Sequence, residues 1–265
     1  MTTRADLRHQ GEALRQELFG AEAALGNPAT GFRDLMAELV YGSFWTRPGM
    51  SKQDRMACTL AALVAVQNWA QFRRHVGAAM NIGLDARAIA EIIIQDGIYR
   101  GFAASETGLE VALAVFAERG ITLPPPERTM SLEDMMAAGR EVQAALHGSR
   151  KDDAHASPDN PITSTIYPLI VQYCYGEIWN RPGLERRVRA LCAVAAFAAL
   201  DHEPLLRKFA LSALNVGASR TEVVEAVVQI GPYSGFAFTL KGLTAVSAVF
   251  ATLPAEERFS APIAR

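Results

Sequence analysis

Apolar residues recur at helical spacing along almost the whole chain. Leu35, Leu39 and Val40 share one face of a predicted helix at 34–45. The segment 52–68 is apolar on nearly every side, as expected for a helix in the centre of a core. No segment alternates with period two between turn residues, so the pattern predicts an all-α fold.

Further helices follow from the same spacing together with residues that start and stop helices. Ser51 and Asp85 are good N-terminal caps, and Gly83 and Gly120 can end the helices that precede them. The helices predicted in this way span 71–80, 86–99, 102–118, 165–179, 184–200, 204–214, 220–230 and 236–251.

A repeat dominates the chain. The segment YGSFWTRPG at 41–49 recurs as YGEIWNRPG at 175–183, and one shift of 134 residues (175 − 41) relates the copies without a gap from 41 to 103. A short amphipathic segment precedes each copy, at 11–20 and at 139–148. The shift pairs Arg55 with Arg189, Cys58 with Cys192, Glu91 with Glu225 and Tyr99 with Tyr233.

Helix-breaking residues separate the two copies. The segment 123–128 is rich in proline, and the polar segment 148–161 reads as a long loop within the second copy. We therefore predict two tandem helical domains, 1–127 and 128–265, that pack against each other as a pseudo-dimer.

Composition excludes several classes of function. Formal net charge is −2 over 265 residues, so no basic field favours nucleic acid. Apolar stretches stay below the roughly 20 residues that span a bilayer, and the N-terminus lacks the pattern of a signal peptide, so we expect a cytoplasmic protein. The five histidines and three cysteines show no metal-ligand spacing, and no phosphate or dinucleotide loop occurs; we expect neither metal nor cofactor.

The order of motifs resembles the carboxymuconolactone decarboxylase family. Trp-x-Arg-Pro-Gly at 45–49 precedes Arg55 in an Ala/Leu-rich helix, then His75, Asn-x-Gly at 81–83 and Glu-(x)3-Gln-(x)3-Tyr-x-Gly-Phe at 91–102. The resemblance covers about 8–118 and 136–250. It implies cofactor-free decarboxylation of γ-carboxymuconolactone and assembly around a three-fold axis, so that three two-domain chains would form a homo-oligomeric ring.

A sister branch, the alkylhydroperoxidase D-like proteins, uses a CxxC pair seven and four residues before its histidine. This chain carries Asn68 and Gln71 there, so peroxidase chemistry through a vicinal dithiol is excluded by residue type. A redox role for the isolated Cys58 would need an exposed thiol of low pKa.

His75 is the leading candidate for proton transfer, because decarboxylation leaves a carbanion that needs a general acid and imidazole titrates near neutrality. It matches the family's active-site histidine, and Gln71 lies one turn before it, where the family usually has Glu. The second copy carries Phe209 and Leu205 at these positions, so we expect it to be catalytically silent; alternatively, Phe209 lines a second, more apolar binding pocket.

The remaining candidates are assigned mainly by position. Glu91 and Tyr99 are further catalytic candidates, and Arg55, Trp45, Asn68 and Phe102 are candidates for binding substrate. Glu91, Tyr99 and Arg55 have identical counterparts in the copy that we expect to be silent, which supports structural roles for them. An Arg–Glu ion pair is favoured for Arg55 over carboxylate binding, and Trp45 is favoured as a core anchor over a ligand contact. Asp96 has no counterpart in the second copy and can add polarity to the first.

The leading hypothesis is a cofactor-independent lyase acting on a small organic acid or lactone. A recruited isomerase or cyclase in a biosynthetic pathway is the alternative within enzymes. A non-catalytic binding or scaffold protein, in which His75 is incidental, is the alternative outside them.

Overall fold

The computed structural model describes residues 2–24, 28–126, 130–149 and 160–254. These segments contain helices and no strand, which confirms the all-α prediction. The helices of the first copy are α1 Arg4–Phe19, α2 Phe32–Leu35, the π-helical η3 Met36–Phe44, α3 Lys52–Ala65, α4 Trp69–Asn81, α5 Ala86–Arg100 and α6 Phe102–Glu118, with short 3₁₀ turns at Gly20–Ala24 (η1) and Pro28–Thr30 (η2).

The second copy repeats this order. Its helices are α7 Leu132–His147, α8 Tyr167–Leu169, the π-helical η6 Ile170–Glu177, α9 Arg186–Ala199, α10 Glu203–Asn215, α11 Arg220–Gln229, α12 Gly231–Ser234 and α13 Phe236–Phe250, with 3₁₀ turns at Thr163–Thr165 (η5) and Ile178–Asn180 (η7). Most of the predicted loop 148–161 lies outside the described residues.

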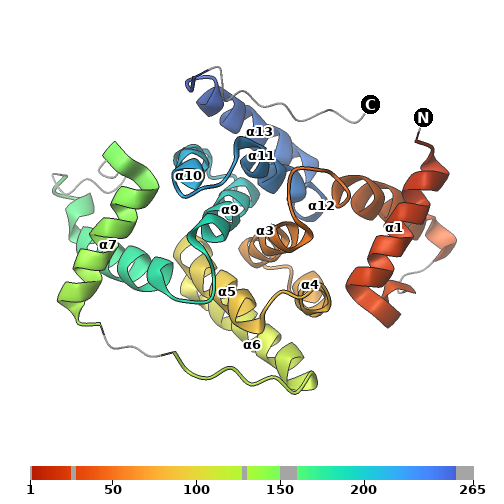
Figure 1. Cartoon of the computed structure of the whole chain (residues 1–265), viewed down its shortest axis with the longest axis horizontal. Helices are drawn as coiled ribbons and strands as arrows, with labels where there is room; N and C mark the ends of the chain where they lie inside the picture. The colour runs from red at the N-terminus through yellow and green to blue at the C-terminus, as the bar shows by residue number, and fades with distance from the viewer. Residues whose placement is uncertain (1, 25–27, 127–129, 150–159, 255–265) are drawn as a thin grey trace.

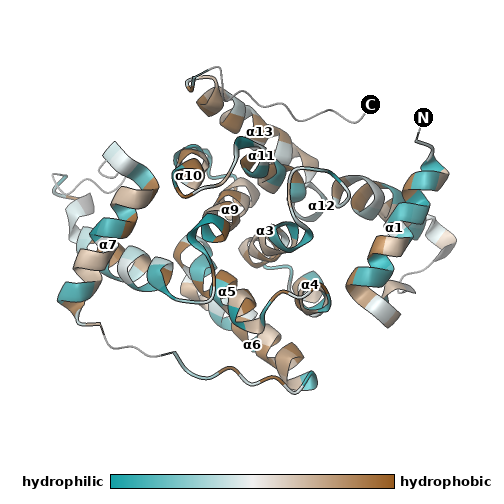
Figure 2. Cartoon of the chain, in the orientation of Figure 1, coloured by the Kyte–Doolittle hydropathy of each residue, from teal (hydrophilic) through white to brown (hydrophobic). Residues whose placement is uncertain are grey.

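Corresponding helices lie on opposite sides of the molecule. Figure 1 shows α1 and α7 at the two ends, α6 and α13 on the two flanks, and α3 beside α9 at the centre. α3 and α9 are almost completely buried. In Figure 2, α1 and α7 carry alternating brown and teal bands, as expected for helices with one buried face. Each copy thus has its own core, and the two cores meet at α3 and α9: Cys58 and Ala62 of α3 join the core of the second copy, and Cys192 of α9 joins that of the first.

The predicted starts and stops hold at several points. The side chains of Ser51 and Asp85 accept hydrogen bonds from the first turns of α3 and α5. The second copy differs after Gln229, where α11 ends before α12 begins at Gly231, because Pro232 has no N–H to continue the ladder. None of the described helices is long and apolar enough to cross a bilayer.

Buried ion pairs tie the copies together. Arg55 and Arg47 of the first copy both bind the carboxylate of Glu225, at 2.8 and 2.7 Å. Arg189 and Arg181 of the second copy bind Glu91 in the same way, at 3.1 and 2.9 Å. The expected pairing of the repeated Arg and Glu residues is confirmed, and each pair joins one copy to the other.

Candidate functional site

His75 lies in the middle of α4 with its ring fully enclosed. The side chain is 1% exposed, and Nδ1 lies 2.8 Å from the main-chain oxygen of Gln71. A carbonyl oxygen can only accept, so Nδ1 carries the proton and donates, and Nε2 holds a lone pair. That Nε2 is buried and has no hydrogen-bond partner among the described residues. The imidazole therefore presents an unused proton-accepting atom to its surroundings.

Aromatic rings from both copies enclose this imidazole. Phe19 at the end of α1 packs edge-to-face on His75 at 5.3 Å, and Tyr233 of the second copy does so at 5.2 Å. Trp45 Nε1 donates a 2.8 Å hydrogen bond to the hydroxyl of Tyr233, and Tyr41 packs against Phe19. We call Phe19, Tyr41, Trp45, His75 and Tyr233 the first aromatic cluster.

Burial sets the protonation state of these groups. Desolvation lowers the pKa of His75 to about 4, with the nearby Arg74 acting in the same direction and the hydrogen bond to Gln71 opposing it. Burial also raises the pKa of Tyr233 well above its usual range, although hydrogen bonds with Trp45 and Thr59 oppose this. At neutral pH the cluster thus holds a neutral imidazole and a neutral phenol.

Two arginines lie over rings of the first aromatic cluster. The guanidinium carbon of Arg74 lies 5.1 Å from the centre of the Phe19 ring, and that of Arg15 lies 5.5 Å from the centre of the Tyr41 ring. A surface hollow of about 150 Å³ adjoins them and is lined by Phe19, Glu22, Arg73, Arg74, Gly77, Ala78, Asn81, Val115, Glu118 and Arg119. Phe19 lines this hollow and also packs on His75, so its ring lies between the hollow and the imidazole.

The structure gives Arg55 and Glu91 structural partners. The guanidinium of Arg55 binds Glu225, Gln229 and the main-chain oxygens of Arg47 and Pro48. The Glu91 carboxylate is occupied by Arg181 and Arg189. The prediction that Arg55 binds a substrate carboxylate and that Glu91 acts in catalysis is therefore replaced by a role in joining the copies.

Tyr99 does not reach His75. Its ring packs on Phe197 at 4.6 Å and on Phe209 at 6.2 Å, both in the second copy. Tyr233, rather than the catalytic candidate Tyr99, lies beside His75, because the tyrosines of α5 and α12 each pack into the opposite copy. Trp45 is a buried core residue as favoured, and its indole N–H also orients Tyr233.

The other predicted residues lie at the margin of the site. Asn68 is exposed and caps α4 by accepting from the Gln71 N–H at 3.3 Å. Gln71 serves His75 through its main chain, so the family's Glu at this position is not needed to orient the ring. Phe102 is 62% exposed at the start of α6 and packs on Gly97. Cys58 is fully buried and burial raises its pKa, which contradicts a redox role.

Sequence reasoning missed Phe19, Arg15, Arg74 and Tyr233. Phe19 and Arg15 lie on α1, ahead of the strongest part of the repeat, and a lone Phe or Arg on an amphipathic helix gives no signal of its own. Tyr233 was visible as the partner of Tyr99 in the repeat, but only the crossing of the two copies places it beside His75.

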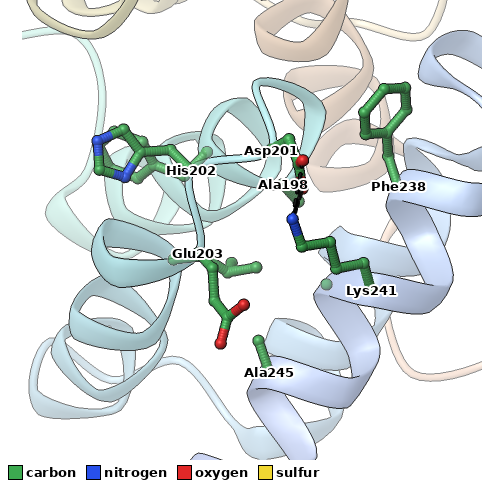
Figure 3. A pocket seen from close by; sticks show the side chains of 10 residues that line it. Ala198, Asp201, His202, Glu203, Phe238, Lys241 and Ala245 are labelled. Atoms are coloured by element: carbon green, nitrogen blue, oxygen red, sulfur yellow. Dashed lines mark hydrogen bonds and ion pairs between the residues drawn. The ribbon is translucent and has the colours of Figure 1, made fainter.

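A second, smaller hollow lies between α9, α10 and α13. Figure 3 shows Asp201 and Lys241 paired at its rim, with Glu203 and His202 alongside. The Lys241 ammonium donates to Asp201 at 2.8 Å. Phe197 also lines this hollow and packs on Tyr99 and Phe209.

Comparison with known proteins relates both halves of the chain to the same family. The sequence profile described as "Carboxymuconolactone decarboxylase family" matches residues 31–114 and again 165–248. The chain is 28% identical over 118 residues to the 4-carboxymuconolactone decarboxylase of Acinetobacter baylyi, covering 42% of this chain and 88% of that protein. It is 29% identical over 99 residues to the nitrosuccinic acid decarboxylase of Metarhizium robertsii, covering 35% of this chain and 68% of that one. An uncharacterised 15.0 kDa protein of Paracoccus denitrificans is 26% identical over 122 residues, covering 45% and 90%.

Proposed function

The chain belongs to the carboxymuconolactone decarboxylase family, and from this premise we propose that it is a cofactor-independent lyase that decarboxylates a small organic acid at the first aromatic cluster. The observation that carries the proposal is the enclosed His75, whose buried Nε2 has no hydrogen-bond partner in the described part of the chain. Such a group is costly to bury unless it serves a ligand. Two relatives are named as decarboxylases of different acids, which supports the reaction class and leaves the acid open.

The substrate carboxylate is proposed to dock on Arg15 and Arg74. Guanidinium groups match the planar geometry of a carboxylate, and both lie against rings of the cluster. Rotation of Phe19, the last residue of α1, opens a path from the arginine-lined hollow to His75. Arg15 and Arg74 thereby take the role that the sequence suggested for Arg55.

Proton transfer follows from the charge of the bound acid. A carboxylate beside the imidazole favours the charged form and raises the pKa of His75 from about 4, so the imidazole takes up a proton when substrate binds. The bond between the carboxylate carbon and the substrate then breaks, carbon dioxide leaves, and the electron pair moves onto the substrate's own carbonyl or nitro group. The imidazolium returns its Nε2 proton to the substrate carbon.

Tyr233 is proposed to stabilise the charge that develops on the substrate. The Tyr233 hydroxyl accepts from the Trp45 N–H, and it also interacts with Thr59, whose own hydroxyl donates to the Arg55 main-chain oxygen. The phenol proton is therefore directed to Thr59 in the free protein and would turn to an enolate or nitronate oxygen when substrate binds. The second copy then contributes directly to the site of the first.

The proposal is tested by following carbon dioxide release from γ-carboxymuconolactone and, separately, from nitrosuccinate. We expect turnover of at least one acid, a loss of at least about 100-fold in kcat for His75→Asn, and a smaller loss for Tyr233→Phe. The exposed Tyr173→Phe serves as the matched control and keeps wild-type kcat.

Two results would overturn the proposal. One is the absence of carbon dioxide release from both acids. The other is turnover that persists in His75→Asn, which would locate the chemistry elsewhere.

A further inference from the structure

The second copy also contains a buried histidine, but on the helix that corresponds to α1 rather than to α4. His147 ends α7 where Phe19 ends α1, and Phe209 stands on α10 where His75 stands on α4. The ring pairs have nearly the same geometry: Phe19 and His75 lie 5.3 Å apart at 86°, and His147 and Phe209 lie 5.3 Å apart at 83°. The two copies have therefore exchanged the positions of one His and one Phe.

His147 belongs to a directed chain of hydrogen bonds. The Ser212 hydroxyl donates to the Lys208 main-chain oxygen at 2.8 Å, so it accepts from Nδ1 of His147 at 2.7 Å. Nε2 of His147 is then the acceptor for the Tyr175 hydroxyl, at 2.9 Å. Ser212 replaces Ala78 of the first copy, so this chain is particular to the second copy.

The surroundings of His147 differ in charge from those of His75. On the offset of 128 residues that relates α1 to α7 (139 − 11), Gln143 replaces Arg15. Lys208 replaces Arg74 on the offset of 134. The guanidinium pair proposed to receive a carboxylate is thus absent from the second copy.

One unsatisfied polar group lies beside this cluster. Asp96 is 1% exposed, and neither carboxyl oxygen has a hydrogen-bond partner within the described segments. It lies one turn before Tyr99 on α5, and the two groups interact electrostatically. Burial raises the pKa of Asp96 well above its usual range, which favours the protonated form, and a protonated carboxyl offers an O–H donor. The counterpart of Asp96 in the second copy is Ile230, whose side chain needs no hydrogen-bond partner.

We propose that the second copy contains a second ligand site, formed by Tyr99, His147, Tyr175, Trp179 and Phe209 (the second aromatic cluster) together with Asp96, and specific for an uncharged aromatic or unsaturated molecule with a carbonyl acceptor, such as a lactone. The rings supply an apolar wall, since Trp179 and Phe197 both pack on Phe209 at 5.9 and 5.1 Å. The Asp96 O–H supplies the donor for the carbonyl.

Access is provided by the hollow of Figure 3. Phe197 lines that hollow and contacts Tyr99 at 4.6 Å, so it stands between the hollow and the second cluster as Phe19 does for the first. The rim charges Asp201 and Lys241 neutralise each other. The Asp201–Lys241 pair therefore does not attract a carboxylate anion to this access route.

The test is binding of phthalide, a neutral aromatic lactone, measured by isothermal titration and saturation-transfer NMR on the full chain. The variants take residues that the other copy already uses at the same place: His147→Phe and Asp96→Ile. We expect saturable binding to the wild type, weakened at least tenfold by each variant and unchanged by His75→Asn.

Phthalide-3-carboxylate separates the two sites in the same experiment. This anion is expected to bind phthalide's site at least tenfold more weakly than phthalide does, because Gln143 and Lys208 stand in place of the guanidinium pair Arg15 and Arg74. The proposal is overturned if phthalide shows no saturable binding up to its solubility, or if His75→Asn abolishes binding that both second-copy variants retain. Decarboxylation at His75 is measured separately, so either proposal can fail alone.

Discussion

At the scale of single residues, the first aromatic cluster contains ionisable side chains that are buried in their uncharged forms. His75 is neutral because burial lowers its pKa to about 4, and the carbonyl that orients it belongs to the main chain. The proposed acid–base role therefore requires a substrate that brings a negative charge to the imidazole. Burial likewise favours the uncharged form of Asp96 by raising its pKa.

The buried imidazole predicts a specific loss of stability in acid. Its pKa is about 4 in the folded chain and near 6.5 when unfolded, so the unfolded chain binds the extra proton between these values. The free energy of unfolding should then fall by about 3 kcal/mol as the pH drops from 6.5 to 4, with no further loss from this group below pH 4.

The measurement is urea denaturation across that range. His75→Gln should remove the drop, whereas His9→Gln, at an exposed position of α1, should retain it. An equal slope for wild type and His75→Gln would show that the imidazole is not buried in its neutral form.

At the scale of elements, each copy depends on one very close helix contact. A Cβ on Gly11 of α1 would lie 1.8 Å from the Ala37 oxygen of η3, and a Cβ on Gly139 of α7 would lie 2.1 Å from the Val171 oxygen of η6. Both partners are π-helical segments, in which the wider turn alters the spacing of the backbone. The glycines thus position α1 and α7, and with them Phe19 and His147.

Gly11→Ala should accordingly destabilise the protein by more than about 2 kcal/mol, because backbone rather than a flexible side chain blocks the methyl group. Gly77→Ala is the matched control within α4: its Cβ meets only the end of the Arg119 side chain at 3.3 Å, and the helix propensity of alanine favours the change by up to about 1 kcal/mol. Thermal unfolding of the two variants gives the comparison. A Tm for Gly11→Ala at or above that of the wild type would contradict the contact.

At the scale of the whole molecule, the copies are interdependent. Each gives its Glu and its tyrosine to the other, so neither aromatic cluster is complete in one half of the chain. The second copy is thus more than a packing partner of the first. Assembly of three chains into a ring stays a prediction from the family resemblance.

Removing one partner of an inter-copy ion pair should be costly. Glu225→Gln leaves the buried Arg55 without a counter-charge, and we expect a loss of about 3–5 kcal/mol in the free energy of unfolding. Glu17→Gln breaks an exposed pair with Lys52 and should cost at most about 1 kcal/mol. Both are measured by urea unfolding; equal effects would mean that the buried pair contributes no more than a surface one.

The sequence by itself determined the helical class, the repeat and the family. Helical periodicity, capping residues such as Ser51 and Asp85, and a constant shift of 134 are local or translational signals, and they survive without knowledge of packing. The motif order made His75 a candidate. The repeat favoured Arg–Glu ion pairs, because an Arg and a Glu that also occur in the copy without the histidine suggest a structural rather than a catalytic role.

Only the tertiary structure decided which residues meet. Tyr99 and Tyr233 are interchangeable in sequence, and their exchange between copies depends on how α5 and α11–α12 cross the interface. His147 was hidden because it aligns with Phe19 on a different helix and a different offset from His75. Contacts between residues about 60 to 190 positions apart are set by helix packing, for which periodicity within one helix carries no information.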